Sequence, residues 1–113
     1  MTPTLIALSR AYMALPGAPQ WSNRLDFWRI LDAARRYDDG TRWLRIEWTW
    51  TLDLTDAATG SVMLDLLAAG GQTVSTFDEP NTYWMMMGGR YEMFGATLAE
   101  AVARVAVALG RAG

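Results

Sequence analysis

The middle of the chain carries a long stretch in which apolar and polar side chains alternate. Between Trp43 and Leu54, apolar side chains occupy the even positions Leu44, Ile46, Trp48, Trp50, Leu52 and Leu54. The odd positions hold the polar side chains Arg45, Glu47, Thr49, Thr51 and Asp53. A period of two residues is the signature of a β-strand with one buried face. The pattern therefore predicts one long strand over residues 43–54, with an apolar face that other elements must cover.

Two amphipathic helices are expected before this strand. The first begins at Thr2-Pro3, where the first turn tolerates proline, and ends at Pro16-Gly17. The second begins at Ser22 or Asn23 and runs to about Tyr37, before the turn-forming residues 38–40. Apolar residues recur at helical spacing in both segments, at Leu5, Leu8, Tyr12 and Leu15 and at Phe27, Trp28, Leu31 and Ala34.

The segment after the long strand is open to two interpretations. In one, residues 56–60 turn a hairpin into a strand over Val62–Leu66. In the other, Thr55 or Ser61 caps a helix that ends at Gly70-Gly71 and carries the apolar residues Met63, Leu64, Leu66 and Leu67. The helix is favoured over the hairpin because leucine and alanine have high helix propensity.

Strands are expected again in the last third of the chain. The pattern predicts strands over Gln72–Phe77 and Thr82–Met87, joined by a turn at residues 78–81. A hairpin to a strand over Arg90–Phe94 follows. Its two-residue connection is Gly88-Gly89, which suits a type I′ turn because both central residues of that turn need positive φ.

The final helix begins with a capping box, in which the Thr97 hydroxyl accepts the amide of Glu100 while the Glu100 carboxylate reaches back. The helix is expected to end at Gly110. Together the elements predict a single α+β domain over residues 1–113, with a helix pair over residues 2–40 and a sheet with packed helices over residues 41–113. The sheet has three to four mostly antiparallel strands. Its layers form either an α–β–α sandwich or a two-layer fold with one open sheet face.

The composition excludes most catalytic chemistries. The chain has no His, Cys or Lys, which removes Cys/His zinc sites, thiol nucleophiles, imidazole acid–base catalysis and Schiff-base chemistry. The acidic pairs fall at predicted element ends, where carboxylates usually form turns and caps: Asp38 with Asp39, Asp53 with Asp56, and Asp78 with Glu79. We therefore assign no catalytic, metal-binding or cofactor-binding residue and expect no enzyme. A small carboxylate-dependent enzyme is the least favoured alternative.

Charge and hydropathy bear on the partners. The net charge is −2 and all 10 cations are arginines, so nucleic-acid binding through clustered cations is disfavoured. No apolar run reaches the roughly 18 residues that a membrane span needs. The first apolar run, from Leu5 to Leu15, contains Ser9 and Arg10, so no signal peptide is expected. We expect a cytoplasmic protein with no membrane partner.

The unusual feature of the composition is its content of tryptophan and methionine, with 6 Trp and 7 Met. Trp28, Trp48 and Trp50 fall on predicted buried faces and are interpreted as core. In contrast, Trp43 is at an odd position, on the same predicted face as the polar residues of its strand. The strand around Trp84 is apolar on both faces, so one interpretation is that the sheet exposes an apolar patch. Trp, Met and Arg are enriched in protein interfaces. If the patch is exposed, the candidate interface residues are Trp43, Arg45, Trp84, Met86 and Arg90.

Residues 76–113 carry three short motifs in order: Tyr83-Trp84-Met85, then Gly88-Gly89-Arg90-Tyr91-Glu92, then residues 95–102 opening an alanine-rich helix. This region resembles the C-terminal half of the phage ABA sandwich domain, a family of small α–β–α proteins of phages and prophages. The resemblance implies a mobile-element accessory protein without catalytic residues, which binds or inhibits a host protein such as a defence complex.

The sequence thus predicts a non-catalytic protein-binding module. The alternative is a self-associating structural protein, in which the same face is buried in a symmetric homodimer.

Overall fold

The computed structural model describes residues 1–20, 33–71, 74–79 and 83–113. Within these residues the chain forms three helices and two three-stranded antiparallel sheets, which confirms the α+β class. In chain order the elements are α1 (Pro3–Met13), β1 (Ala34–Arg36), β2 (Arg42–Ile46), β3 (Thr49–Leu52), α2 (Ala57–Ala69), β4 (Val74–Glu79), β5 (Tyr83–Gly88), β6 (Tyr91–Gly95) and α3 (Leu98–Leu109).

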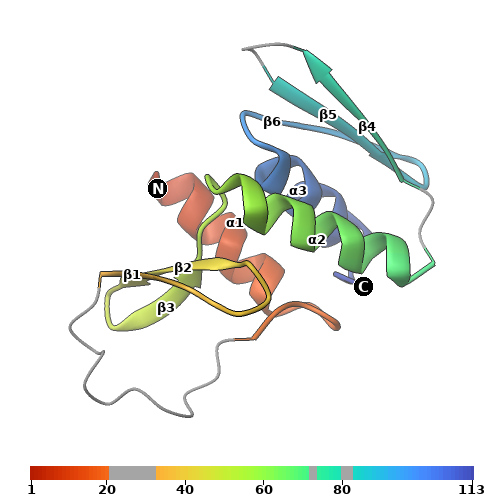
Figure 1. Ribbon diagram of the computed structural model, residues 1–113. Coiled ribbons are helices and arrows are strands. Elements are labelled where there is room, and N and C mark those ends of the chain that lie inside the picture. The colour runs from red at the N-terminus through yellow and green to blue at the C-terminus, as the bar shows by residue number, and fades with distance from the viewer. Residues whose placement is uncertain (21–32, 72–73, 80–82) are drawn as a thin grey trace.

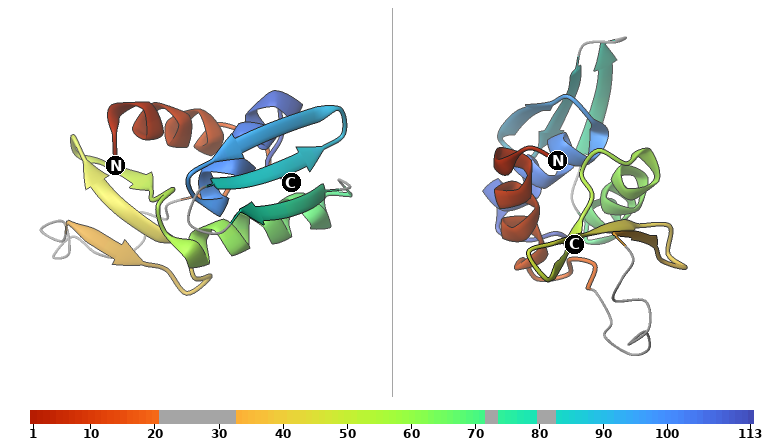
Figure 2. Two further views of the ribbon diagram at one scale, coloured as in Figure 1. Left: turned by 90° about the horizontal axis from the view of Figure 1, so that it is seen from above. Right: turned by 90° about the vertical axis from the view of Figure 1, so that its left-hand side faces the viewer.

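The three helices lie between the two sheets (Figures 1 and 2). The strand orders are β1-β2-β3 and β4-β5-β6, so each sheet is a simple meander. Helix α3 is central: it packs on α1, on α2 and on the β4–β5–β6 sheet, while α1 also packs on β3. Among the described elements, this layer order is the reverse of an α–β–α sandwich, in which helices cover both faces of one sheet.

Local signals in the sequence explain the three helices. At the start of α1 the Thr2 hydroxyl accepts from the amide of Leu5. The capping box before α3 is confirmed, since the Thr97 hydroxyl accepts from the Glu100 amide and the Glu100 carboxylate accepts from the Ala96 amide. Gly110 ends α3 in the left-handed conformation that favours glycine.

The ambiguous segment is a helix. Its N-cap is Asp56, whose carboxylate accepts from the amide of Thr59, and not Thr55 or Ser61 as expected. Its last residue is Ala69, and Gly70 is the C-cap, as the sequence indicated. The hairpin alternative for this segment is therefore wrong.

The prediction of one long strand over residues 43–54 is wrong. The chain reverses at Glu47-Trp48, and β2 pairs with β3 as a hairpin in which Trp43 lies opposite Leu52. Residues that lie opposite each other point to the same face. A two-residue turn therefore places the odd-numbered residues of β2 and the even-numbered residues of β3 on the same face of the sheet. For this reason Trp43 and Leu52 are both fully buried.

The second N-terminal helix is not formed where it was expected to end. Ala34–Arg36 is strand β1, and Arg35 lies opposite Trp43 of β2. The turn residues 38–40, interpreted as a helix stop, close this β1–β2 hairpin, and the Tyr37 amide donates to the carbonyl of Thr41 at 2.8 Å. The rest of that predicted helix falls on residues 21–32, outside the described residues.

The predicted C-terminal hairpin is present, with its turn displaced by one residue. Strand β5 includes Gly88, which lies opposite Tyr91, so the connection is Gly89-Arg90. Only Gly89 has positive φ, so the type I′ prediction is wrong and the turn has the pattern of type II′. Strand β4 extends to Glu79, so the expected turn residues Asp78 and Glu79 are in a strand, while residues 80–82 lie outside the described part.

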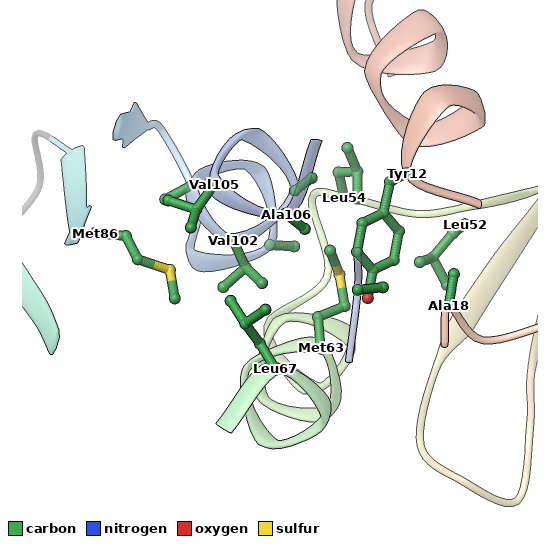
Figure 3. Close-up of a cluster of buried hydrophobic side chains, with 14 of the residues drawn as sticks. Tyr12, Ala18, Leu52, Leu54, Met63, Leu67, Met86, Val102, Val105 and Ala106 are labelled. Carbon is green, nitrogen blue, oxygen red and sulfur yellow. The ribbon is translucent and has the colours of Figure 1, made fainter. Parts of the chain in front are cut away.

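The core lies around α3 (Figure 3). Met86 of β5 points toward Val102 and Val105 of α3, and Tyr12 of α1 lies on the other side of the cluster. Small residues allow the close packing: a Cβ on Gly60 of α2 would lie 2.8 Å from the backbone nitrogen of Ala99 in α3. None of the helices in the described part of the chain combines the length and the apolarity that crossing a membrane needs.

Candidate functional site

The most exposed large apolar side chain is at the tip of the β2–β3 hairpin. Among the described residues, Trp48 leaves 82% of its surface in water, against 47% for Phe94 and 38% for Val107. The next residue back in the chain, Glu47, is also exposed, with 79% of its side chain in solvent. We call Glu47 and Trp48, together with Arg45 of β2 and Arg10 of α1, the hairpin-tip site.

The turn that carries Trp48 has a strained backbone. Glu47 has φ of 53° and Trp48 has φ of 65°, and in the described part of the chain they are the non-glycine residues with positive φ. Type I′ turns need positive φ at both central residues and are usually built from Asn-Gly or Asp-Gly. A side chain with Cβ in this region costs roughly 1–2 kcal/mol per residue. The chain therefore holds a large aromatic side chain where the backbone favours glycine.

Arg45 lies beside the exposed indole. Its guanidinium carbon is 4.9 Å from the centre of the Trp48 ring, within the range of a cation–π interaction. Within the described residues, the Arg45 side chain has no hydrogen bond and no ion pair, and its Nη1 atom is buried without an acceptor.

Arg10 attaches the tip to α1. One guanidinium nitrogen is 3.7 Å from the Glu47 carboxylate, and another donates to the Ile46 carbonyl at 3.4 Å. The residue before Arg10 in α1 is the buried Ser9, whose hydroxyl donates to the carbonyl of Leu52 at 2.6 Å. These contacts hold the hairpin on α1, so the tip is presented by a fixed support and not by a free loop.

A second surface is the face of the β4–β5–β6 sheet opposite α3, which we call the outer face. Successive residues of a strand point to opposite faces, so Glu92 and Phe94 lie on the outer face when Gly95 packs on α3. Both are exposed, and Phe94 lies opposite Met85, which lies opposite Phe77 of β4. No described helix lies over this face (Figure 1).

The structure does not bring the five candidate interface residues together. Trp43 and Met86, expected on an exposed face, are fully buried. The Trp43 indole donates to the Thr41 hydroxyl at 2.8 Å. The face of β5 that carries Trp84 and Met86 is the one that α3 covers, so Trp84 is half-buried against the core.

Arg45 and Arg90 are the remaining two candidates, and they lie in different sheets. Arg45 belongs to the hairpin-tip site. Arg90 is exposed on the β5–β6 turn and contacts the hydroxyl of Tyr91 at 3.1 Å. The residue that the sequence reasoning missed is Trp48, which the alternating pattern placed in the core. No glycine, asparagine, aspartate or proline in Glu47-Trp48 signals the turn that exposes it.

The acidic side chains serve the fold. Asp53 is buried, pairs with Arg42, and accepts from the amide and hydroxyl of Thr55. Asp56 caps α2 and pairs with Arg36 at 2.9 Å, and this hydrogen bond lowers the pKa of Asp56 to about 2. Within the described part of the chain, no three acidic side chains gather closely enough to hold a metal ion.

Comparison with known proteins adds no relative: no family model, no curated protein and no solved structure matches the chain. Its function has to be inferred from the chemistry of its own residues.

Proposed function

We propose that the protein is a non-catalytic protein-binding module that uses the hairpin-tip site as its anchor. The observation that carries the proposal is the 82% exposure of Trp48 on a turn with two positive φ angles. Backbone strain of this kind persists at binding sites, where it holds a side chain in a required position. Trp and Arg are also the residues that most often dominate binding energy in protein interfaces.

The energetic balance supports a role in binding rather than in folding. An exposed cation–π pair contributes about 0.5–1 kcal/mol, and an exposed ion pair contributes about 0–1 kcal/mol. These gains are smaller than the roughly 2–4 kcal/mol of strain in two left-handed residues with side chains. Glu47-Trp48 is therefore a poor choice for stability alone. A partner that covers the indole would add the hydrophobic term that the free protein lacks.

The rigidity of the support fits the same role. Hairpin β2–β3 is paired to β1 on one side and fastened to α1 by Ser9 and Arg10. An anchor that is ordered before binding loses little conformational entropy when the partner arrives. The carboxylates Asp53 and Asp56 are engaged in caps and ion pairs, which supports the non-catalytic part of the proposal.

The identity of the partner is the finer part of the proposal. In line with the resemblance of residues 76–113 to a phage domain, the partner is a host protein such as a component of a defence complex, met in the cytoplasm. This part rests on the resemblance alone.

A selection from a library of displayed random peptides tests the proposal, because it does not require the natural partner. Peptides are selected on the wild-type protein, and their affinities are then measured on Trp48→Ala and on Phe94→Ala, the matched change at the other exposed aromatic. A central Trp anchor predicts an affinity loss of about 30-fold or more in Trp48→Ala. Phe94→Ala retains wild-type affinity. Selected peptides that bind Trp48→Ala as tightly as wild type contradict the proposal.

Self-association is the second candidate function, and the exposed Phe94 on the outer face favours it. Phe94 leaves 47% of its surface in water, in register with Met85 and Phe77 across the sheet. A symmetric dimer would bury this face against its copy. Sedimentation equilibrium of wild type and Phe94→Ser separates the two functions. A mass that stays monomeric up to millimolar concentration excludes self-association, whereas a dimer that Phe94→Ser dissociates supports it.

A further inference from the structure

The hairpin-tip site carries an excess of positive charge in an acidic protein. It contains two arginines and one glutamate, whereas the whole chain has a net charge of −2. Glu47 lies 3.7 Å from Arg10 and neutralises it in part. Among the described residues no carboxylate pairs with Arg45, so one full positive charge remains beside the exposed indole.

The donors of Arg45 are arranged for one kind of ligand. Its Nη1 atom is buried against the protein, and the Nε and Nη2 atoms are left without an acceptor in the described part of the chain. These two nitrogens form one edge of the guanidinium, with parallel N–H groups that match the two oxygens of a carboxylate. The Trp48 ring lies 4.9 Å from the guanidinium carbon, so a ligand on this edge would also touch the indole.

We infer that the hairpin-tip site recognises an acidic protein segment, in which a carboxylate pairs with the Nε–Nη2 edge of Arg45 and a neighbouring apolar side chain covers Trp48. The inference rests on the proposed protein-binding function and adds the chemistry of the partner. A carboxylate satisfies the unused donors, and the apolar neighbour removes the indole from water. An exposed carboxylate in the partner thus meets a positive charge that the protein itself leaves unpaired.

A nucleic acid is the rival ligand, since aromatic rings and arginines also bind bases and phosphates. Such binding relies on a groove lined with cations that follows several phosphates. In the described part of the chain, the tip presents one unpaired arginine beside a single exposed ring. The site therefore fits one carboxylate better than a phosphate chain.

The test uses the ¹⁵N-labelled protein, into which four probes are titrated separately. The first is a blocked tripeptide, glutamate–leucine–glutamate. The second and third replace both glutamates with glutamine or with lysine, and the fourth is an oligothymidylate of eight nucleotides. The readouts are the indole N–H resonance of Trp48 and the Nε–H resonance of Arg45, followed as each probe is titrated.

The glutamate peptide is expected to shift both resonances. It should bind about tenfold more tightly than the glutamine peptide, because a charge-assisted hydrogen bond between its carboxylate and Arg45 contributes about that much affinity. The lysine peptide binds more weakly still. Arg45→Gln removes the tenfold preference, and 0.5 M salt reduces it. The matched control, Arg90→Gln, leaves the preference unchanged. Thermal unfolding of Arg45→Gln and Arg90→Gln checks that both variants are folded.

Three results overturn the inference. Equal affinity for the glutamate and glutamine peptides, both lost in Trp48→Ala, refutes the acidic partner and leaves protein binding at Trp48 standing. Tighter binding of the oligothymidylate than of any peptide identifies a nucleic-acid site instead. The absence of any shift with all four probes refutes recognition at the tip, and the peptide selection then decides whether another surface binds.

Discussion

Replacing Glu47-Trp48 by Asn-Gly is expected to make the protein more stable while it abolishes partner binding. The double change, Glu47→Asn with Trp48→Gly, puts the preferred type I′ residues into a turn that now has φ of 53° and 65°. It removes most of the backbone strain, which is about 1–2 kcal/mol for each residue. It also removes the side chain that we propose as the anchor.

The expected gain follows from the contacts that are lost. The cation–π pair with Arg45 is worth about 0.5–1 kcal/mol, and the pair between Glu47 and Arg10 is worth about 0–1 kcal/mol. The new glycine adds about 0.5–1 kcal/mol of backbone entropy to the unfolded state. Set against about 2–4 kcal/mol of relieved strain, the net gain is about 1 kcal/mol, which raises the Tm by about 4 °C.

Thermal unfolding followed by circular dichroism measures the stability, and titration of a selected peptide measures the binding. A variant that is more stable and does not bind indicates a position kept for function at the expense of stability. A variant with a lower Tm would refute the reasoning, because it would show that Glu47 and Trp48 stabilise the fold. Trp48→Gly alone separates the contribution of the indole from that of the Glu47 ion pair.

Three further predictions concern the fold. Gly70→Ala is expected to destabilise the protein by about 1–3 kcal/mol, because its Cβ would lie 2.3 Å from the carbonyl carbon of Gly113 and displace that residue; chemical denaturation measures this. Tyr12→Phe is expected to leave the free energy of unfolding within about 0.5 kcal/mol or to raise it, because the Tyr12 hydroxyl is buried without a partner among the described residues and its burial raises its pKa; the same denaturation experiment checks it. The ion pair with Arg36 lowers the pKa of Asp56 from 3.8 to about 2, so its stabilisation is present above about pH 4 and is lost as the pH falls toward 2. Asp56→Asn keeps a capping side chain. It should reduce the change in the free energy of unfolding between about pH 4 and pH 2 by about 1 kcal/mol, after allowance for solvent screening.

Controls exist for each of these changes. Gly71→Ala places a Cβ in open space at a φ of 86°, so its effect reports backbone strain without the clash at Gly70. A Gly70→Ala variant as stable as the wild-type protein would contradict the clash. A loss of more than about 1 kcal/mol in Tyr12→Phe would show that the hydroxyl has a partner. An unchanged acid-unfolding curve for Asp56→Asn, beside the exposed control Asp38→Asn, would contradict the assigned ion pair.

Helices were predictable from the sequence because their start and stop signals are local. The Thr97 capping box, the Gly110 stop and the Gly70 C-cap each depend on residues within one turn of the helix end. The helix over Ala57–Ala69 was likewise favoured by its leucines and alanines. The structure confirms these signals, whereas the turn residues 38–40, interpreted as a helix stop, close the β1–β2 hairpin instead.

The error at residues 43–54 has a specific physical cause. Alternation shows that a segment is extended, but it does not show where the chain reverses. Turn residues normally give that information, and Glu47-Trp48 contains none of them. Because a two-residue turn exchanges the faces, the same error exchanged Trp43 with Trp48: the one expected at the surface is in the core, and the one expected in the core is at the surface.

The candidate site was missed for the same reason. Arg45 was selected from the correct strand, but its neighbour in space, Trp48, was assigned to the core. The second error in face assignment occurred in β5, where both faces are apolar and the sequence gives no preference. Packing on α3 decides that Met86 is inside, and this contact joins residues distant in sequence.

The most direct test of the central claim is the affinity of a selected partner peptide for Trp48→Ala, measured by calorimetry beside the wild-type protein. Trp48→Ala keeps a Cβ at the strained position and loses the cation–π pair with Arg45, worth about 0.5–1 kcal/mol, so the variant should stay folded with a Tm slightly below that of wild type. We expect the affinity to fall by about 30-fold or more. An affinity equal to that of wild type, in a folded variant, would contradict the assignment of the hairpin tip as the binding anchor.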